Sequence, residues 1–384
     1  MSITRRFFEE NKGTWIVATD AEPDGVKALE ATVASGLAGL VVVAHGSESQ
    51  LADKAFVANR VCQCYHSAAP VVVDEPLPAD TPAYPSHAQL AGVFAELGTS
   101  IVGLTPAGPA LEDFVLSERC RAVLWLAAPA GLLRLARSTR PGVAEALRGA
   151  VLVLSLTADD RGARDEDAAA MPAALARFGG VRIVDSVHAL DAGDSVSAAE
   201  YLRIFSPARG GRDTEPTGSY RLQSSLRRAF DELIHAESVA ACNALTDGAY
   251  GRASSRDIFM LEVARNKGVL AAARAPKRAC PGDSPERDAE IADAMRALTA
   301  SHEMAQITER RDGMHMCFAD QLAVLAAIGL LDANAVPTHV VFRPDGTFVR
   351  STDAPSAVPV TLYAKISRSR AVGAFCDVCD VDVR

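Results

Sequence analysis

Short runs of apolar residues without polar alternation recur along the first part of the chain and alternate with amphipathic segments. The runs at 15–18 and 39–44 predict buried strands, because a strand covered on both faces needs no exposed polar side. The segment 51–65 predicts a helix, and a capping box of Ser47 and Gln50 precedes it. Strands that alternate with helices in this way indicate a mostly parallel sheet with right-handed crossovers.

The same alternation continues in the second part of the chain. Residues 122–156 read as strand, turn, two helices and strand, and residues 338–350 read as a hairpin around the turn Pro344-Asp345-Gly346. Long amphipathic stretches predict further helices at 222–245, 258–269 and 289–306. The predicted fold class is α/β: a mostly parallel, open, Rossmann-like sheet flanked by helices, with additional C-terminal helices and a β-hairpin.

Three carboxylates, those of Asp20, Glu22 and Asp24, follow the first predicted strand directly. Carboxylates this close repel one another, and desolvating them is costly unless a cation or a hydrogen-bonded ligand compensates. Strand-to-helix turns in open α/β sheets lie at the carboxyl ends of the strands, where ligands bind. Two interpretations stay open, a ligand-binding turn and a solvated acidic turn that caps the following helix.

The segment TDAEPDG at residues 19–25 resembles the N-terminal signature of the nucleoside hydrolase family. In that family an Asp-rich turn, ending in two adjacent Asp residues, holds a calcium ion and the ribose. Asp20 falls on the first aspartate and Asp24 on the first of the adjacent pair, whereas Gly25 stands where the second should be. The resemblance implies that Asp20 is a metal ligand and the catalytic base, and that Asp24 binds ribose.

The segment GDSVSAAEYLRIFSP at residues 193–207 resembles a second family motif, in which an Asn, a Glu and another Asn hydrogen-bond the ribose hydroxyls. Asp194 stands in place of the first Asn, and Glu200 is kept. Leu202 replaces the second Asn and can neither donate nor accept a hydrogen bond. The resemblance implies substrate-binding roles for Asp194 and Glu200.

Two further metal ligands are implied by the resemblance. Within MCFADQLAVLAAIGLL, residues 316–331, Asp320 matches a calcium-binding Asp of the family, and Ala319 stands where some members carry a proton-donating His. His315 is either a substitute for that His or a surface histidine. In the segment 122–156, the backbone carbonyl of Ala130 would reach the calcium ion.

As a whole, the resemblance implies a single nucleoside-hydrolase-like domain over residues 1–384, with insertions near 157–192 and 270–312. Family members are hydrolases, glycosidases that release the base of a nucleoside. One hypothesis is therefore an active hydrolase with a remodelled site that uses calcium and binds a nucleoside or another small ribosyl ligand. A second is a weak or inactive member, a pseudoenzyme that serves as a binding or structural subunit. A third is an unrelated doubly wound α/β protein whose motif matches arose by chance.

The altered positions favour the second hypothesis over the first. Gly25, Leu202 and Ala319 each remove a polar group that the family uses, so they favour a weakened or lost calcium site and an inactive member. Family members assemble as dimers or tetramers, which implies a homo-oligomer.

Charge and cysteine usage exclude several classes of function. A net charge of −9 without any basic run argues against binding of nucleic acid. The longest apolar runs fall short of the roughly 20 residues that span a bilayer, and no apolar stretch follows the N-terminal basic pair, so we expect neither a membrane segment nor secretion. The eight cysteines are scattered, which indicates a cytoplasmic or other reducing compartment. Cys376-x-x-Cys379 has metal-like spacing, but no second close pair with that spacing accompanies it.

Overall fold

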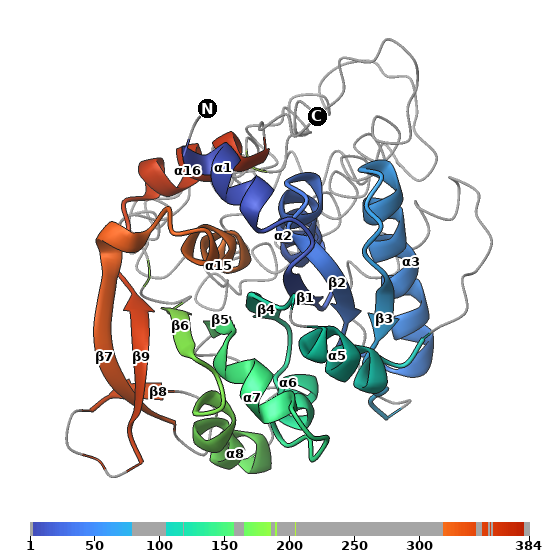
Figure 1. Ribbon diagram of the computed structural model, residues 1–384. Coiled ribbons are helices and arrows are strands. Elements are labelled where there is room, and N and C mark those ends of the chain that lie inside the picture. Colours follow the sequence, from blue (N-terminus) through green and yellow to red (C-terminus); the bar gives the residue numbers. More distant parts are fainter. Residues whose placement is uncertain are drawn as a thin grey trace, which may run out of the picture.

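A computed structural model of the chain describes residues 3–78, 105–117, 119–156, 165–185, 318–342 and 356–379, together with 189, 204, 348–351 and 354. In this part of the chain nine strands form one sheet with helices on both faces (Figure 1). The strands are β1 (Trp15–Thr19), β2 (Ala38–Val43), β3 (Val71–Val73), β4 (Ala122–Leu126), β5 (Val151–Leu156), β6 (Gly180–Asp185), β7 (Ala335–Phe342), β8 (Phe348–Arg350) and β9 (Val358–Tyr363). The helices are α1 (Ile3–Glu10), α2 (Pro23–Ala34), α3 (Glu48–Cys64), α5 (Ala107–Leu116), α6 (Ala130–Ala136), α7 (Val143–Arg148), α8 (Asp165–Leu175), α15 (Ala319–Ala327) and α16 (Arg368–Cys379), and a 3-10 turn, η2, spans Asp332–Asn334.

The strand order is β3-β2-β1-β4-β5-β6-β9-β7-β8. Strands β1 to β6 and β9 run parallel, whereas β7 is antiparallel to both β9 and β8. This confirms the predicted α/β class, the mostly parallel sheet and the pairing of the two hairpin strands, whereas the turn Pro344-Asp345-Gly346 lies outside the described residues. It also shows that β6, within the range 157–192 that the resemblance marks as an insertion, is an integral strand of the sheet and is reached through α8.

Successive residues of β1 pack on opposite faces of the sheet. Trp15 and Val17 join the core under α2, α3, α15 and α16, whereas Ile16 and Ala18 join the core under α5, α6, α7 and α8. All five residues of β1 are buried. A strand with helices on both faces has no solvated side, which is why its sequence is apolar throughout rather than alternating.

Along the sequence, β2 and β3 are added on one side of β1, and β4, β5 and β6 are then added on its other side. Right-handed crossovers in the two directions place their helices on opposite faces. The chain therefore leaves β1 toward α2 on one face and leaves the neighbouring β4 toward α6 on the other. At such a reversal a crevice opens outside the carboxyl ends of the strands, and ligands bind there in open α/β sheets.

Other predictions from the sequence can be compared with the structure as well. The N–H of Ser47 donates to Oε1 of Gln50 at 3.0 Å, so the predicted capping box is confirmed at the start of α3. The predicted helices at 222–245, 258–269 and 289–306 lie outside the described residues. No helix among the described residues has the length and hydrophobicity needed to cross a membrane.

Two buried cysteines make the stability of the protein dependent on alkaline pH. Cys62 on α3 and Cys120 before β4 are buried, and burial raises the pKa of each thiol from 9.0 to about 12. A thiol with a raised pKa in the folded state contributes stability that is present below the unfolded pKa and is lost as pH rises through the folded one. We therefore expect the free energy of unfolding to fall between pH 9 and 12, by up to about 1.4 kcal/mol for each pH unit and each thiol.

Urea unfolding at a series of alkaline pH values checks this expectation. The double variant Cys62→Ala/Cys120→Ala, although less stable throughout, should lose stability less steeply with pH than the wild-type protein. Identical slopes for the two proteins would show that other groups cause the alkaline loss.

Candidate functional site

The turn after β1 is held by its own side-chain oxygens. Oγ1 of Thr19 accepts a hydrogen bond from the N–H of Ala21 at 2.9 Å, and Oδ1 of Asp20 accepts one from the N–H of Glu22 at 3.2 Å. Ala21 adopts a left-handed backbone conformation with φ of 54°. Pro23 then begins α2, where its missing N–H removes no helical hydrogen bond. The acidic turn is thus a fixed structure at the carboxyl end of β1.

Asp20 and Asp320 converge on one point above Gly25. A Cβ atom placed on Gly25 would lie 2.9 Å from Oδ1 of Asp20 and 3.5 Å from Oδ2 of Asp320. Asp320 is buried in the first turn of α15, and α15 packs against α2. Two carboxylates from opposite ends of the sequence therefore meet at the carboxyl edge of the sheet. The N-termini of α2 and α15 both face this point, and the positive ends of their dipoles favour negative charge there.

The space above Gly25 is too small for any side chain. The same Cβ atom would lie 2.7 Å from Oγ1 of Thr19, a distance that real Cβ atoms do not reach. The Thr19 side chain is fully buried and fixed by its hydrogen bond to Ala21. The turn therefore leaves no room for a side chain at residue 25, where the resemblance would place the second Asp of the adjacent pair.

A buried lysine neutralises the middle carboxylate of the turn. The ammonium of Lys54, on α3, donates to the carbonyl oxygen of His45 at 2.8 Å and lies 3.6 Å from Oε1 of Glu22. The side chains of Lys54 and Glu22 are only 3% and 11% exposed. Sequence reasoning missed Lys54, although a signal was present. Lys54 lies three residues after Leu51 and four before Ala58, on the apolar stripe of its helix, where a lysine needs a buried partner.

The remaining predicted site residues are placed as follows. Asp24 lies in the first turn of α2, next to Gly25. Ala130 is the first residue of α6, which follows the strand paired with β1. The residues Asp194, Glu200, Leu202 and His315 lie outside the described part of the chain. The structure thus brings Asp20 and Asp320 together, and the roles predicted for these two and for the other residues stay predictions.

The described donors fall short of a calcium cage. Calcium takes six to eight oxygen ligands, most of them from carboxylates and carbonyls. Asp20 and Asp320 supply carboxylates at the point above Gly25, and Glu22 is paired with Lys54 instead. Within the described ranges no group of three or more Asp, Glu, His or Cys side chains has the arrangement of a metal site.

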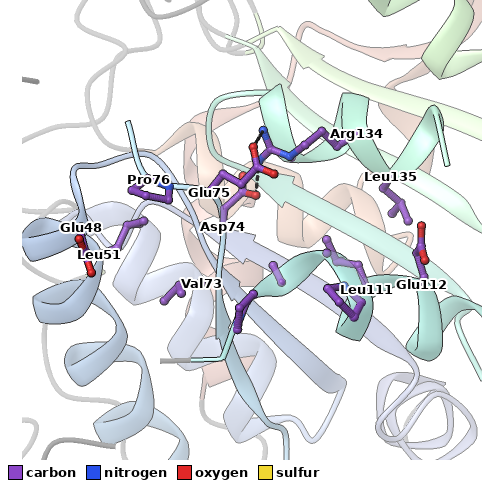
Figure 2. A pocket seen from close by; sticks show the side chains of 15 residues that line it. Glu48, Leu51, Val73, Asp74, Glu75, Pro76, Leu111, Glu112, Arg134 and Leu135 are labelled. Atoms are coloured by element: carbon purple, nitrogen blue, oxygen red, sulfur yellow. Dashed lines mark hydrogen bonds and ion pairs between the residues drawn. The ribbon is translucent and has the colours of Figure 1, made fainter. Parts of the chain in front are cut away.

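A separate cavity of about 440 Å³ opens between α3, β3, α5 and α6 (Figure 2). Apolar side chains such as Leu51, Val73 and Leu111 line it together with several carboxylates. On one wall, Arg134 binds Asp74 through Nη2 and lies 3.1 Å from Oε2 of Glu75 through Nη1 (Figure 2).

Both arms of the Arg134 guanidinium are therefore engaged within the protein. A Cβ on Gly131 would overlap the Asp74 carboxylate, so this glycine lets the carboxylate lie against the first turn of α6. The ion pair ties α6 to the end of β3. Neither Asp20 nor Asp320 lines the cavity, which sets it apart from the convergence point above Gly25.

Comparison with models of known protein families finds none that matches this chain, and comparison with curated proteins finds none either.

Proposed function

We propose that this chain is a nucleoside-hydrolase-like protein whose calcium and ribose site is depleted, and that it acts as a binding or structural subunit with weak or no hydrolysis. The observation that carries the proposal is the convergence of Asp20 and Asp320 above Gly25. The motif resemblance expects two distant carboxylates to meet at the carboxyl edge of the sheet, and these two do. The missing third carboxylate and the closed space around it support the inactive form.

The internal cation is a second support. In the family, carboxylates of the acidic turn are compensated by calcium. Here the ammonium of Lys54 compensates Glu22 from within the protein, at 3.6 Å. A carboxylate that already has a buried partner gains little from an added cation, because its charge is largely neutralised. Glu22 is therefore a poor replacement for the ligand missing at Gly25.

The alternative is an active N-glycosidic hydrolase. The convergence of Asp20 and Asp320 is expected of an active enzyme as well. Calcium, when bound, would orient the attacking water and lower the pKa of that water. Asp20 would then accept a proton from the water as general base, while Asp24 and Glu200 would hold the ribose hydroxyls. The alternative requires further oxygen ligands beyond Asp20 and Asp320.

A calcium titration with an assay for free ribose distinguishes the two forms. We expect the midpoint of thermal unfolding to stay constant as calcium is added, because a ligand raises the midpoint only if it binds the folded state. We also expect no release of ribose from inosine or uridine above the rate without protein. A calcium-dependent rise in the midpoint, together with ribose release, would establish the active hydrolase instead.

Matched variants make the result specific to the site. Asp320→Asn should abolish any calcium response that comes from this site, whereas Asp53→Asn, at an exposed position on α3, should leave it unchanged. Gly25→Asp restores the residue that the motif lacks. Because the turn is closed at Gly25, we expect this variant to be less stable and to gain no calcium response.

A further inference from the structure

Two cysteines share one face of the last helix that the structure describes. Cys376 and Cys379 are three residues apart in the final turn of α16, and both are half-buried against the core under α2 and α15. Helix α16 packs on these two helices (Figure 1). Cys62 and Cys120, whose side chains the structure also describes, are buried in the interior. The pair in α16 is thus the accessible one.

The spacing brings the two sulfur atoms within reach of each other. Residues three apart on a helix have Cβ atoms about 5–6 Å apart. A disulfide needs Cβ atoms about 3.5–4.5 Å apart, so a shift of about 1–2 Å is required. The last turn of a helix can make such a shift at small cost, because its carbonyls have no helical partners.

A buried ammonium group lies on α2, one of the helices against which α16 packs. Lys27, on α2, is 5% exposed, and its Nζ lies 2.5 Å from Oε2 of Glu30. Burial lowers the pKa of Lys27, but Glu30, Cys379 and Cys376 together raise it above the ordinary value. The ammonium is therefore within electrostatic range of both sulfur atoms. The attraction is mutual, and a cation beside a thiol favours the thiolate, which is the nucleophilic form.

The carboxylate of Glu30 opposes this effect. This carboxylate accepts a hydrogen bond from the hydroxyl of Tyr65 as well as from Lys27, so its charge is shared between two donors.

We propose that Cys376 and Cys379 form a redox-active dithiol, which a low-molecular-weight disulfide oxidises to a disulfide within α16. The thiolate of Cys379 attacks one sulfur of the small disulfide, forms a mixed disulfide and expels one thiolate. The thiolate of Cys376 then attacks the sulfur of Cys379 and expels the second small thiolate. Two electrons pass from the protein to the small disulfide, and the two protein protons end on the two small thiols. The proposal is independent of the function proposed above.

The competing use of a Cys-x-x-Cys pair is a zinc site, which needs four ligands. Among the described residues no third Cys, His or carboxylate completes such a group. The redox assignment is therefore the one that the surroundings of the pair favour, and zinc is an outcome that the experiment must detect.

The test uses the full chain equilibrated in mixtures of oxidised and reduced glutathione, followed by acid quenching, alkylation and peptide mass spectrometry. We expect the peptide that carries Cys376 and Cys379 to lose two hydrogens as the oxidised fraction rises. The peptides of Cys62 and Cys120 should stay reduced until the protein is denatured. In Cys376→Ser, glutathione should stay attached to Cys379, because the second attack is lost.

The role of the lysine is tested by the alkylation rate of the pair at neutral pH. Lys27→Met should slow it several-fold, because the thiolate loses the attraction of the ammonium. Lys365→Met, which removes an exposed lysine before α16, should leave the rate unchanged. If Lys27→Met does not fold, Lys27→Met/Glu30→Gln removes both charges of the pair, and a smaller slowing is expected, because the opposing carboxylate is lost as well.

Three results would overturn the proposal. The first is a pair that stays reduced when glutathione is fully oxidised. The second is an alkylation rate as slow as that of Cys62. The third is bound zinc whose removal is needed before the pair reacts.

Discussion

Replacing Lys54 with methionine is expected to lower the free energy of unfolding by about 3 kcal/mol, the usual cost of breaking a buried ion pair on one side. Methionine is one atom shorter than lysine and fills most of the same space, but it cannot donate to the carbonyl oxygen of His45, 2.8 Å from the ammonium. It also takes the cation away from Glu22, whose side chain is 11% exposed. Urea unfolding followed by circular dichroism measures the change.

The double variant Glu22→Gln/Lys54→Met is the control. If the loss comes from leaving a buried carboxylate without its cation, the double variant should recover more than half of it, because neither charge remains. Equal losses in the single and double variants would assign the cost to packing or to the His45 hydrogen bond. Comparing the two variants thus separates the cost of an unpaired buried charge from the cost of changed packing and the lost His45 hydrogen bond.

Gly39→Ala is expected to lower the free energy of unfolding by a similar amount, about 3 kcal/mol, through steric overlap inside the sheet layer. A Cβ on Gly39 would lie 2.6 Å from the carbonyl carbon of Gly13 and 2.6 Å from Cζ of Phe114. The backbone at Gly13 cannot easily retreat, because its N–H donates to the carbonyl oxygen of Gly36 at 2.8 Å. The variant should show a lower midpoint of urea unfolding.

Gly373→Ala supplies the matched control, because a Cβ on Gly373 in α16 would meet no heavy atom within 4 Å. Removing a helical glycine there should raise the stability by about 0.5–1 kcal/mol. A loss at Gly373 comparable to that at Gly39 would show that the overlap at Gly13 is not the cause.

The sheet could be predicted from the sequence because its strands carry a local signal. The runs that became β1, β2 and β5 are apolar and bounded by turns, so their identity depends on neighbouring residues alone. The start of β7 was expected at Thr338, yet the strand begins at Ala335 and includes Pro337. Pro337 is tolerated there because β8 pairs only with the end of β7, from Val340 on, which leaves the earlier residues at a sheet edge.

The candidate site could be predicted only in part, since its contacts are long-range. The meeting of Asp20 and Asp320 followed from the order of the motifs, not from any local pattern. The pairing of Glu22 with Lys54 depends on how α3 lies against the turn after β1, and spacing along the sequence does not encode that. The closed space at Gly25 likewise depends on the rotamer of Thr19, which no sequence pattern specifies.

The position of Asp320 on α15 also has a consequence for folding. The strands β1 to β6 precede α15 in the sequence, and Asp320 reaches Gly25 only when α15 docks against α2. Closing so long a loop costs entropy, and such contacts form late when local ones can form first. The acidic turn should therefore spend part of the folding reaction hydrated, with the carboxylates of Asp20 and Asp320 brought together in one of the final steps.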